Sequence, residues 1–302
     1  MKPALVILAA GIGSRYGSLK QVDPVGPSGE TIMDYSLFDA LRSGFGRCVF
    51  IIQKTMEKEF RDVILDKLQD RVETGFVFQD MKGDVPDSFT IPPERVKPWG
   101  TAHAVLAAAS EIREPFAVIN ADDFYGREPF GAMADFLSGV RNDEPRYAVV
   151  GYDLDGTLSE HGAVARGVCE VDAYGMLEGI VERTHVERTK FGIVFQDGSG
   201  HHIPVPPGKT VSMNFWGFTP TYFAYTRSAF LKFLAERGAD SKAEMYIPLV
   251  INQMINERAA TCEVIPTAAR WFGVTYKEDR PLVIEELAKL VARGEYPRSL
   301  WK

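Results

Sequence analysis

The N-terminal segment constrains the fold more than any other part of the sequence. Residues 4–11 read ALVILAAG, with an apolar residue or glycine at every position. A strand of this composition has to be covered on both faces, which is typical of the central strands of parallel sheets that carry helices on both sides. Gly11, Gly13 and Gly17 follow in quick succession and let the backbone turn sharply. We therefore expect a central parallel strand that ends in a glycine-rich turn.

Short apolar segments alternate with longer amphipathic segments through the first half of the chain. Strands are expected at 48–53, 75–80 and 115–122, and helices at 31–44, 56–70 and 101–112. Each strand and the helix after it span about 35 residues, which is the size of a βαβ unit. The first half should therefore be a wound sheet with parallel strands.

The second half changes character, because strand patterns follow one another without helices between them. These patterns cover 147–154, 168–186, 191–198 and 211–219, and the proline-rich segment 203–210 is expected to be a surface loop. The last third is expected to be helical. One helix is predicted at 241–257, where Ser241 and Glu244 form a capping-box pattern, and another at 281–294, where Gly294 ends it.

The pattern as a whole predicts an α/β fold class. We expect a Rossmann-like, mixed, mostly parallel sheet flanked by helices, with an inserted β-rich substrate lobe and a helical C-terminus. No linker, repeat or low-complexity tract divides the sequence. A single domain over residues 1–302 is the expected organisation.

Composition and charge argue against several classes of function. The 34 basic and 41 acidic residues give a net charge of −7 without a basic cluster, which disfavours nucleic acid as a partner. No apolar stretch reaches the roughly 20 residues that span a bilayer, and the N-terminus lacks a convincing signal-peptide cleavage site. Three widely spaced cysteines favour buried thiols in a reducing compartment. We expect a soluble cytoplasmic protein without a membrane partner, and its oligomeric state stays open, a homo-oligomer included.

The glycine-rich turn is the best candidate for a ligand site. Its backbone N–H groups can approach phosphate oxygens, and Arg15 and Lys20 beside it supply positive charge for a polyphosphate. Two other interpretations stay open: a tight turn with two solvated cations, and a loose match to a dinucleotide-binding turn. The next strand lacks the acidic residue of a dinucleotide site, and the absence of a GKS or GKT tripeptide excludes a P-loop.

The same turn resembles the signature LAAGxGxR of the nucleotidyltransferases that transfer a nucleoside monophosphate to a sugar 1-phosphate. The matching positions are Leu8, Ala9, Ala10, Gly11, Gly13 and Arg15, with Lys20 in the place of the signature's lysine. The proline that normally precedes this lysine is missing, since the chain reads LKQ there. The resemblance implies that the residues up to Gly13 bind the nucleotide and that Arg15 and Lys20 act in catalysis.

Two later segments resemble nucleotide-binding motifs of this family. Gln79 ends the segment FVFQ, where the family places a glutamine that reads the base, and this favours a pyrimidine. WGTAHAV resembles the family's LGTGHAV, which implies that Gly100 and Thr101 meet the base and the ribose. An insertion of about fifteen residues separates Gln79 from Gly100, and the sequence assigns no role to it.

The segment VINADDFYG resembles the strand end that carries the family's magnesium-binding aspartate. The resemblance implies that Asp122 is a catalytic residue and a ligand of the cofactor Mg²⁺, which accepts carboxylates together with phosphate oxygens. An aspartate pair that caps the following turn is the alternative. A second ligand is expected close to Thr275, and Asp279 is our candidate. The alternative for Asp279 is an acidic residue favoured at a helix N-terminus.

Three residues in the second half would bind the sugar if the resemblance extends that far. Gly162 lies in HGAVARGV, Glu182 in IVERT and Asn214 in MNFWGF, and each segment is similar to a sugar-contacting motif of the family. Each also has a structural alternative. Glu182 stands among other charges at a strand end, and Asn214 lies in an aromatic run that is typical of a core. A buried amide there would need partners, which a sugar could supply.

The resemblance implies Mg²⁺-dependent transfer of a nucleoside monophosphate from a nucleoside triphosphate (NTP) to a sugar 1-phosphate, with release of pyrophosphate. Residues 1–140 would form the nucleotide-binding half, 141–235 the sugar-binding lobe and 236–302 the helical C-terminal part. Three alternatives remain: a nucleotide-binding regulatory subunit without catalysis, a transferase with a non-sugar phosphomonoester as acceptor, and a nicotinamide-dependent oxidoreductase. No Ser-His-Asp or Cys-His arrangement is evident, and attack by a phosphate oxygen requires none.

Overall fold

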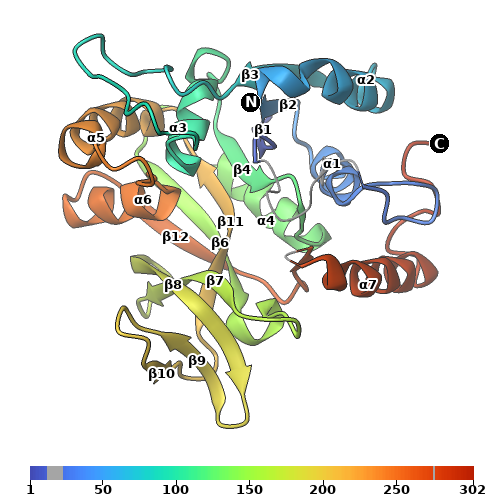
Figure 1. Cartoon of the computed structure of the whole chain (residues 1–302). Helices are drawn as coiled ribbons and strands as arrows, with labels where there is room; N and C mark the ends of the chain where they lie inside the picture. The colour runs from blue at the N-terminus through green and yellow to red at the C-terminus, as the bar shows by residue number, and fades with distance from the viewer. Residues whose placement is uncertain (12–22, 275) are drawn as a thin grey trace.

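A mixed sheet forms the centre of the molecule (Figure 1). The computed structural model describes residues 1–11, 23–274 and 276–302. The strand order is β10-β9-β8-β7-β11-β4-β1-β2-β3. Off this path, β6 pairs with β11, and β12 pairs with β6. The parallel strands of the first half are β1 (Ala4–Leu8), β2 (Arg47–Ile52), β3 (Glu73–Phe78) and β4 (Phe116–Asn120). This part of the sheet confirms the predicted wound arrangement.

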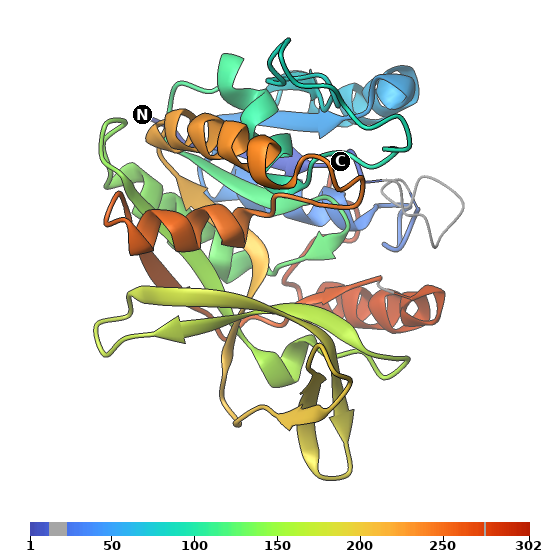
Figure 2. The same cartoon turned by 60° about the vertical axis from the view of Figure 1, so that its left-hand side comes forward.

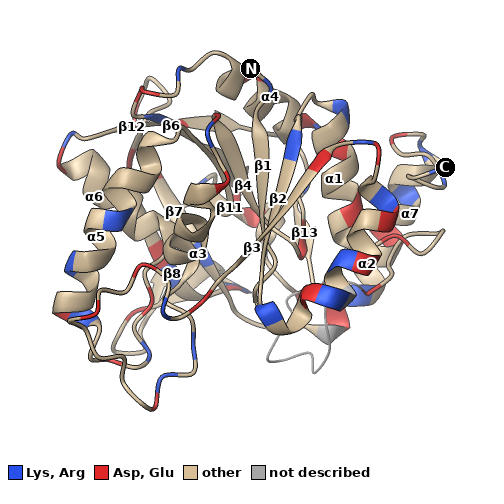
Figure 3. Ribbon diagram, turned by 90° about the horizontal axis from the view of Figure 1, so that it is seen from above, with Lys and Arg blue, Asp and Glu red and all other residues tan. Residues whose placement is uncertain are grey.

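Helices cover both faces of the parallel strands (Figure 3). One face carries α1 (Ile32–Arg42), α2 (Glu57–Leu68) and α4 (Arg127–Ser138), and the other carries α3 (Thr101–Leu106), α5 (Thr221–Arg237) and α6 (Ile247–Asn256). Strand β1 contributes to both cores, since Val6 belongs to one buried cluster and Leu5 and Ile7 belong to the other. The prediction of a central strand covered on both faces is therefore confirmed.

The second half contributes antiparallel strands to the same sheet. They are β6 (Arg146–Asp153), β7 (Val164–Val171), β8 (Leu177–Thr189), β9 (Gly192–Gln196), β10 (His202–Pro204) and β11 (Thr210–Phe218). The ribbon from β7 to β10 projects below the helices as a separate lobe (Figure 2). Part of the loop predicted at 203–210 is a strand, because Ile203 and Pro204 pair with β9 at the edge of the lobe. The predominance of parallel pairing holds for the first half alone.

The C-terminal third is less helical than the sequence suggests. Strand β12 (Thr261–Pro266) pairs in parallel with β6 and buries Cys262 and Val264. The capping box predicted at Ser241 was wrong, since α6 begins only at Ile247. The Ile247 N–H donates instead to Thr101 Oγ1 at 3.1 Å, so a hydroxyl from another part of the chain takes the place of a local cap. The final helix α7 (Arg280–Ala292) and its stop at Gly294 agree with prediction.

Two short strands connect the sheet to α7. They are β5 (Asp123–Phe124), which follows β4 almost directly, and β13 (Phe272–Gly273), which pairs with it. All three cysteines are free and buried, as predicted. Across the described residues, no helix has both the length and the apolar character that crossing a membrane requires.

Candidate active site

A cavity of about 1190 Å³ opens at the carboxyl ends of the parallel strands. Open α/β sheets bind ligands at this edge, because the segments that follow neighbouring strands meet there. Leu8 at the end of β1 and Asn120 at the end of β4 are register partners, which places those segments side by side. The cavity brings together seven residues that the sequence predicts for the site: Leu8, Ala10, Gly11, Gln79, Gly100, Thr101 and Asp122.

The first part of the glycine-rich turn is fixed by the neighbouring strand β2. Ala9 is fully buried, and its N–H donates to the Ile51 carbonyl oxygen at 2.9 Å. Gln53 Nε2 donates to the Ala10 carbonyl oxygen at 2.8 Å. The remainder of the turn, with Gly13, Arg15 and Lys20, lies outside the described residues, so the predicted roles of these three residues stay predictions.

The insertion between Gln79 and Gly100 does not separate these residues in space. Gln79 Nε2 donates to the Gly100 carbonyl oxygen at 3.2 Å, and both residues line the cavity. The inserted segment folds back onto α5, where Trp99 is fully buried against Phe230 and donates from Nε1 to the Met81 carbonyl oxygen at 2.8 Å. Part of the insertion is thus a wall of the cavity, and the base-reading role of Gln79 stays a prediction.

Gly100 and Thr101 belong to the framework of the cavity. Gly100 has a φ of +103°, and a Cβ on it would lie 2.6 Å from the Met245 carbonyl oxygen. Backbone hydrogen bonds hold the two segments together, from the Met245 N–H to the Trp99 carbonyl oxygen at 2.7 Å and from the Ala102 N–H to Met245 at 3.0 Å. Only glycine meets both demands, the positive φ and the close backbone approach.

The two aspartates after β4 have different surroundings. Asp122 lines the cavity. Asp123 begins β5, and its Oδ2 accepts hydrogen bonds from Asn120 Nδ2 at 2.8 Å and from the Tyr125 hydroxyl at 3.4 Å. Asp122 is therefore the carboxylate of this pair that a phosphate group in the cavity would meet.

The cavity fits the donor set expected for magnesium. Mg²⁺ is commonly held by one or two carboxylates together with substrate phosphates, and it keeps several waters. Asp122 supplies one such carboxylate on a wall with room for a polyphosphate. Among the described residues, no three His, Cys, Asp or Glu side chains form a group that could hold a metal. If substrate phosphates complete the coordination of the metal, the protein has to supply only one or two carboxylates.

Asp279 lies at the start of α7, where both of its carboxylate oxygens accept hydrogen bonds. Ser159 Oγ donates to Oδ1 at 2.9 Å, and the Tyr276 N–H donates to Oδ2 at 2.7 Å. The residue is only 6% exposed and is not one of the described residues that line the cavity. Asp279 is at the N-cap position of α7, as in the alternative that the sequence offered, but its side chain makes no capping hydrogen bond to that helix. Its metal role stays a prediction, and Thr275 lies outside the described residues.

Glu182 lies on the lobe, directly across from Gly167. The two residues are register partners on β8 and β7, and a Cβ on Gly167 would lie 3.6 Å from Glu182 Oε2. Burial by the surrounding strands raises the pKa of Glu182, and Arg166 opposes this rise. Gly162 precedes β7 and packs against Tyr276, whose hydroxyl would lie 2.8 Å from an added Cβ. The glycine beside Glu182 is thus Gly167, which the sequence analysis did not select.

Asn214 is part of a hydrogen-bonded chain behind the cavity. Its Nδ2 donates to Asn120 Oδ1 at 2.7 Å, and its Oδ1 accepts from Trp216 Nε1 at 2.9 Å. Asn120 lines the cavity and also donates to Asp123. The amide of Asn214 therefore has protein partners. It would affect a ligand in the cavity by orienting the side chain of Asn120.

Comparison with known proteins shows the family of the chain. The family model described as "Nucleotidyl transferase" matches residues 4–272 of the chain. The chain belongs to the nucleotidyl transferase family. No curated protein matches it.

Two solved structures have the same fold as this nucleotidyl transferase. The inositol-1-phosphate CTP transferase from T. maritima superposes with a TM-score of 0.61 at 14% identity and covers 96% of both chains. HddC from Yersinia pseudotuberculosis superposes with a TM-score of 0.57 at 16% identity over 94% of this chain and 99% of that one. At these identities the likeness shows the fold alone, and it confirms the predicted fold class.

Several residues of this nucleotidyl transferase line the cavity although the sequence analysis did not select them, among them Asn120, Lys54 and Lys97. Asn120 is the last residue of β4 and lies two residues before the end of the predicted strand 115–122. Lys54 and Lys97 are 71% and 63% exposed, and they pair with Glu57 and, at 3.9 Å, with Glu244. These lysines are distant from the glycine-rich turn in sequence, so charge clustering along the chain could not reveal them. Both lysines have a carboxylate partner, and Asp80, Asp122 and Glu244 also line the cavity, so the lysines offset acidic charge there.

Proposed function

We propose that this nucleotidyl transferase moves a nucleoside monophosphate from an NTP to a sugar 1-phosphate or a related phosphomonoester and releases pyrophosphate. One observation carries the proposal: a single cavity joins Gly11, Gln79, Gly100 and Asp122, which are far apart in sequence. Its volume of about 1190 Å³ exceeds that of most single-ligand sites, so it has room for parts of two substrates.

The reaction asks the protein for positioning and charge stabilisation. An oxygen of the acceptor phosphate attacks the α-phosphorus, a new P–O bond forms, and the bond to the β-phosphate breaks as pyrophosphate leaves. Asp122 lines the cavity and is proposed to face the phosphates, and Mg²⁺ bound there would neutralise their charge. Arg15 and Lys20 are proposed to act on the same phosphates. Lys54 and Lys97 line the cavity too, each beside a carboxylate partner.

Gln79 is our candidate for recognition of the base. Its Nε2 already donates one hydrogen to the Gly100 carbonyl oxygen, which fixes the orientation of the amide. The second N–H and the amide oxygen remain available as a donor and an acceptor. This pair suits the edge of a pyrimidine, in keeping with the family's use of a glutamine here.

The acceptor class is proposed to include cyclic polyol phosphates as well as sugar 1-phosphates. The structural neighbour that is named for inositol 1-phosphate supports this range of acceptors, since both acceptor types present a phosphomonoester and ring hydroxyls. Glu182 is the candidate for contact with those hydroxyls, because a carboxylate accepts two hydrogen bonds from neighbouring hydroxyl groups. Gly167 lies opposite Glu182, and a Cβ there would lie 2.9 Å from the Ile180 side chain, so a larger residue would crowd this part of the lobe.

Pyrophosphate release tests the proposal directly. The full chain is incubated with Mg²⁺, each of four NTPs, and either inositol 1-phosphate or one of several sugar 1-phosphates. We expect release with a pyrimidine triphosphate and one acceptor class, and loss of release in excess EDTA. NTP binding without release for any acceptor would indicate a regulatory subunit. Full activity in EDTA would contradict the metal assignment, and a change in NAD(H) fluorescence on titration would support the oxidoreductase alternative.

A further inference from the structure

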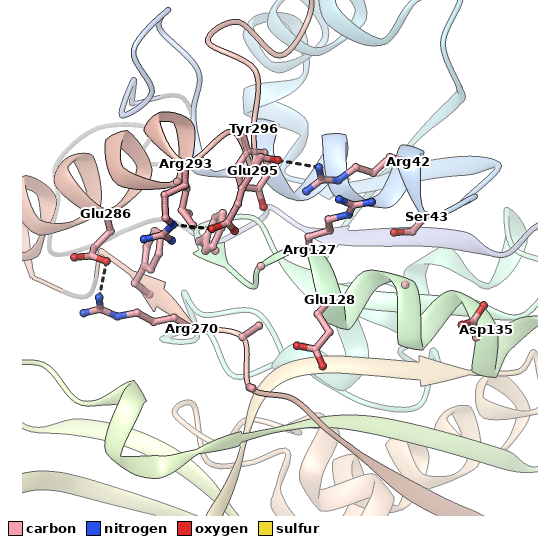
Figure 4. A pocket seen from close by; sticks show the side chains of 17 residues that line it. Arg42, Ser43, Arg127, Glu128, Asp135, Arg270, Glu286, Arg293, Glu295 and Tyr296 are labelled. Carbon is pink, nitrogen blue, oxygen red and sulfur yellow. Dashed lines mark hydrogen bonds and ion pairs between the residues drawn. The ribbon is translucent and has the colours of Figure 1, made fainter.

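A second cavity of about 810 Å³ lies where α1, α4 and α7 meet (Figure 4). Its lining includes four arginines, and we call it the arginine pocket: Arg42, Arg127, Arg270 and Arg293. No residue of the described chain lines both this pocket and the candidate active site. The volume lies within the usual range of small-molecule sites.

Two of the four arginines are neutralised by neighbours on the same wall. Arg270 pairs with Glu286 at 2.5 Å, and Arg293 pairs with Glu295 at 2.9 Å, as the dashed lines of Figure 4 show. Because of these pairs, Arg270 and Arg293 have little positive charge left to attract a ligand. The other carboxylates of the lining, Glu128 and Asp135, are exposed, and Glu128 accepts a hydrogen bond from Thr267 at 3.2 Å.

Arg42 and Arg127 are different. Arg42 pairs with the buried Asp39 and donates to the Glu295 carbonyl oxygen at 3.1 Å, but its buried Nε has no hydrogen-bond acceptor within the described residues. Arg127 is exposed and makes no hydrogen bond or ion pair to any residue that the structure describes. Both guanidinium groups act on Asp39, where burial raises the pKa to about 6 and the bonded Tyr296, Arg42 and Arg127 oppose the rise. Two cations thus share one buried carboxylate.

An unmet buried donor and an unpaired cation at one cavity wall indicate a missing anionic partner. Buried polar groups in native structures are nearly always hydrogen-bonded, so the Arg42 Nε calls for an acceptor. Guanidinium groups present parallel N–H donors that match the oxygens of a phosphate. The lining carries four arginines and four carboxylates, so the case for an anion rests on the donors of Arg42 and Arg127 and not on net charge. A phosphate group offers several acceptor oxygens, so it can bond both guanidinium groups at once.

We propose that the arginine pocket is a second ligand site, which binds a phosphate-bearing small molecule between Arg42 and Arg127. The site differs from the candidate active site in its residues and in its lack of a metal-binding aspartate. It stands whether or not the proposed transfer reaction is correct, because it rests on a separate cavity. The rest of that cavity, with the rings of Phe272 and Tyr296 in its wall, leaves room for the body of the ligand.

Hydrogen–deuterium exchange of the full chain with inorganic phosphate as the probe tests the proposal. Potassium chloride at equal ionic strength controls for general salt effects. We expect millimolar phosphate to slow exchange in peptides from the start of α4 and from residues 293–300. In Arg127→Gln the affinity measured from this protection should fall about tenfold or more, the usual effect of losing a charge-assisted hydrogen bond.

Arg141→Gln is the matched control, since Arg141 is 72% exposed and pairs with Asp143 away from both cavities. Its phosphate affinity should equal that of the wild type. Peptides from residues 100–106 report separately on phosphate in the candidate active site, and their protection should persist in both variants. The proposal is overturned by protection confined to residues 100–106, by equal protection in chloride, or by undiminished affinity in Arg127→Gln.

Discussion

The candidate active site and the arginine pocket lie within a few residues of each other along the chain but are built in opposite ways. Asp122 lines the first, and Phe124 and Arg127 line the second. The active site takes its walls from strand ends and from turns whose backbone comes close to other segments. The arginine pocket combines side chains on α1, α4 and α7 with the turns and short strands beside these helices. The active site depends on the close approach of backbone segments, whereas the ligand contacts proposed for the arginine pocket depend on two side chains, Arg42 and Arg127.

The largest difference between the two cavities should be in catalysis. Asp122→Ala removes the carboxylate proposed to hold the metal, and the rate of pyrophosphate release should fall by about a hundredfold or more, as for loss of one electrostatic stabiliser. Asp135→Ala is the control, because Asp135 is an exposed carboxylate in the arginine pocket. Its turnover should be unchanged. A folded Asp122→Ala protein with wild-type turnover would remove Asp122 from the mechanism.

Glycine-to-alanine substitutions in the two cavities should have opposite effects on the free energy of unfolding. Gly100→Ala places a Cβ 2.6 Å from the backbone of Met245 at a φ of +103°. Strain and overpacking should together lower the free energy of unfolding by about 3 to 5 kcal/mol. Urea unfolding monitored by circular dichroism measures this change.

Gly131 provides the matched substitution in the arginine pocket. It lies inside α4, and no atom lies within 4 Å of a Cβ built there. Gly131→Ala should therefore raise the free energy of unfolding by up to about 1 kcal/mol, the difference in helix propensity. Equal effects of the two substitutions would contradict the view that close backbone packing constrains Gly100 and not Gly131.

The same contrast explains how much the sequence could predict. The apolar segment 4–11 predicts the central strand, and the alternation of strand and helix patterns predicts the parallel half of the sheet. These two features follow from local chemistry, such as a strand that must be covered on both faces. The seven predicted residues that line the cavity were selected by their resemblance to family motifs. The contact between Gln79 and Gly100 across a long insertion agrees with the motif order, although the sequence could not show how the insertion folds.

The features that the sequence missed depend on partners distant in the chain. Strand β12 is short, and it forms because β6 offers it a free edge. The start of α6 is set by Thr101, about 145 residues away, and a local capping pattern at Ser241 could not reveal this. The arginine pocket could not be predicted from the sequence either, since Arg42 and Arg127 have no sequence pattern in common. Tertiary contacts decide such features, and one sequence does not record them.

The last of the expected effects depends on pH and concerns the carboxylate behind the arginine pocket. Asp39 is buried, and burial raises its pKa from 3.8 to about 6, even though Tyr296 donates to it at 2.6 Å and Arg42 and Arg127 lie nearby. A raised pKa means that the folded protein favours the protonated acid. The stability that protonation provides is thus fully present below about pH 4 and is lost as the pH rises through 6.

Unfolding measured from pH 4 to 7 in the wild type and in Asp39→Asn isolates this contribution. The stability of the wild type relative to the variant should fall by about 3 kcal/mol across that range, since two pKa units correspond to that free energy. A constant difference would mean that the pair with Arg42 fully offsets the cost of burial. Arg127→Gln sharpens the result, because loss of a cation near Asp39 should move the pH midpoint upward. An unchanged midpoint would show that Arg127 has no electrostatic effect on Asp39. It would also count against the proposal that Arg127 and Arg42 bind a phosphate group together.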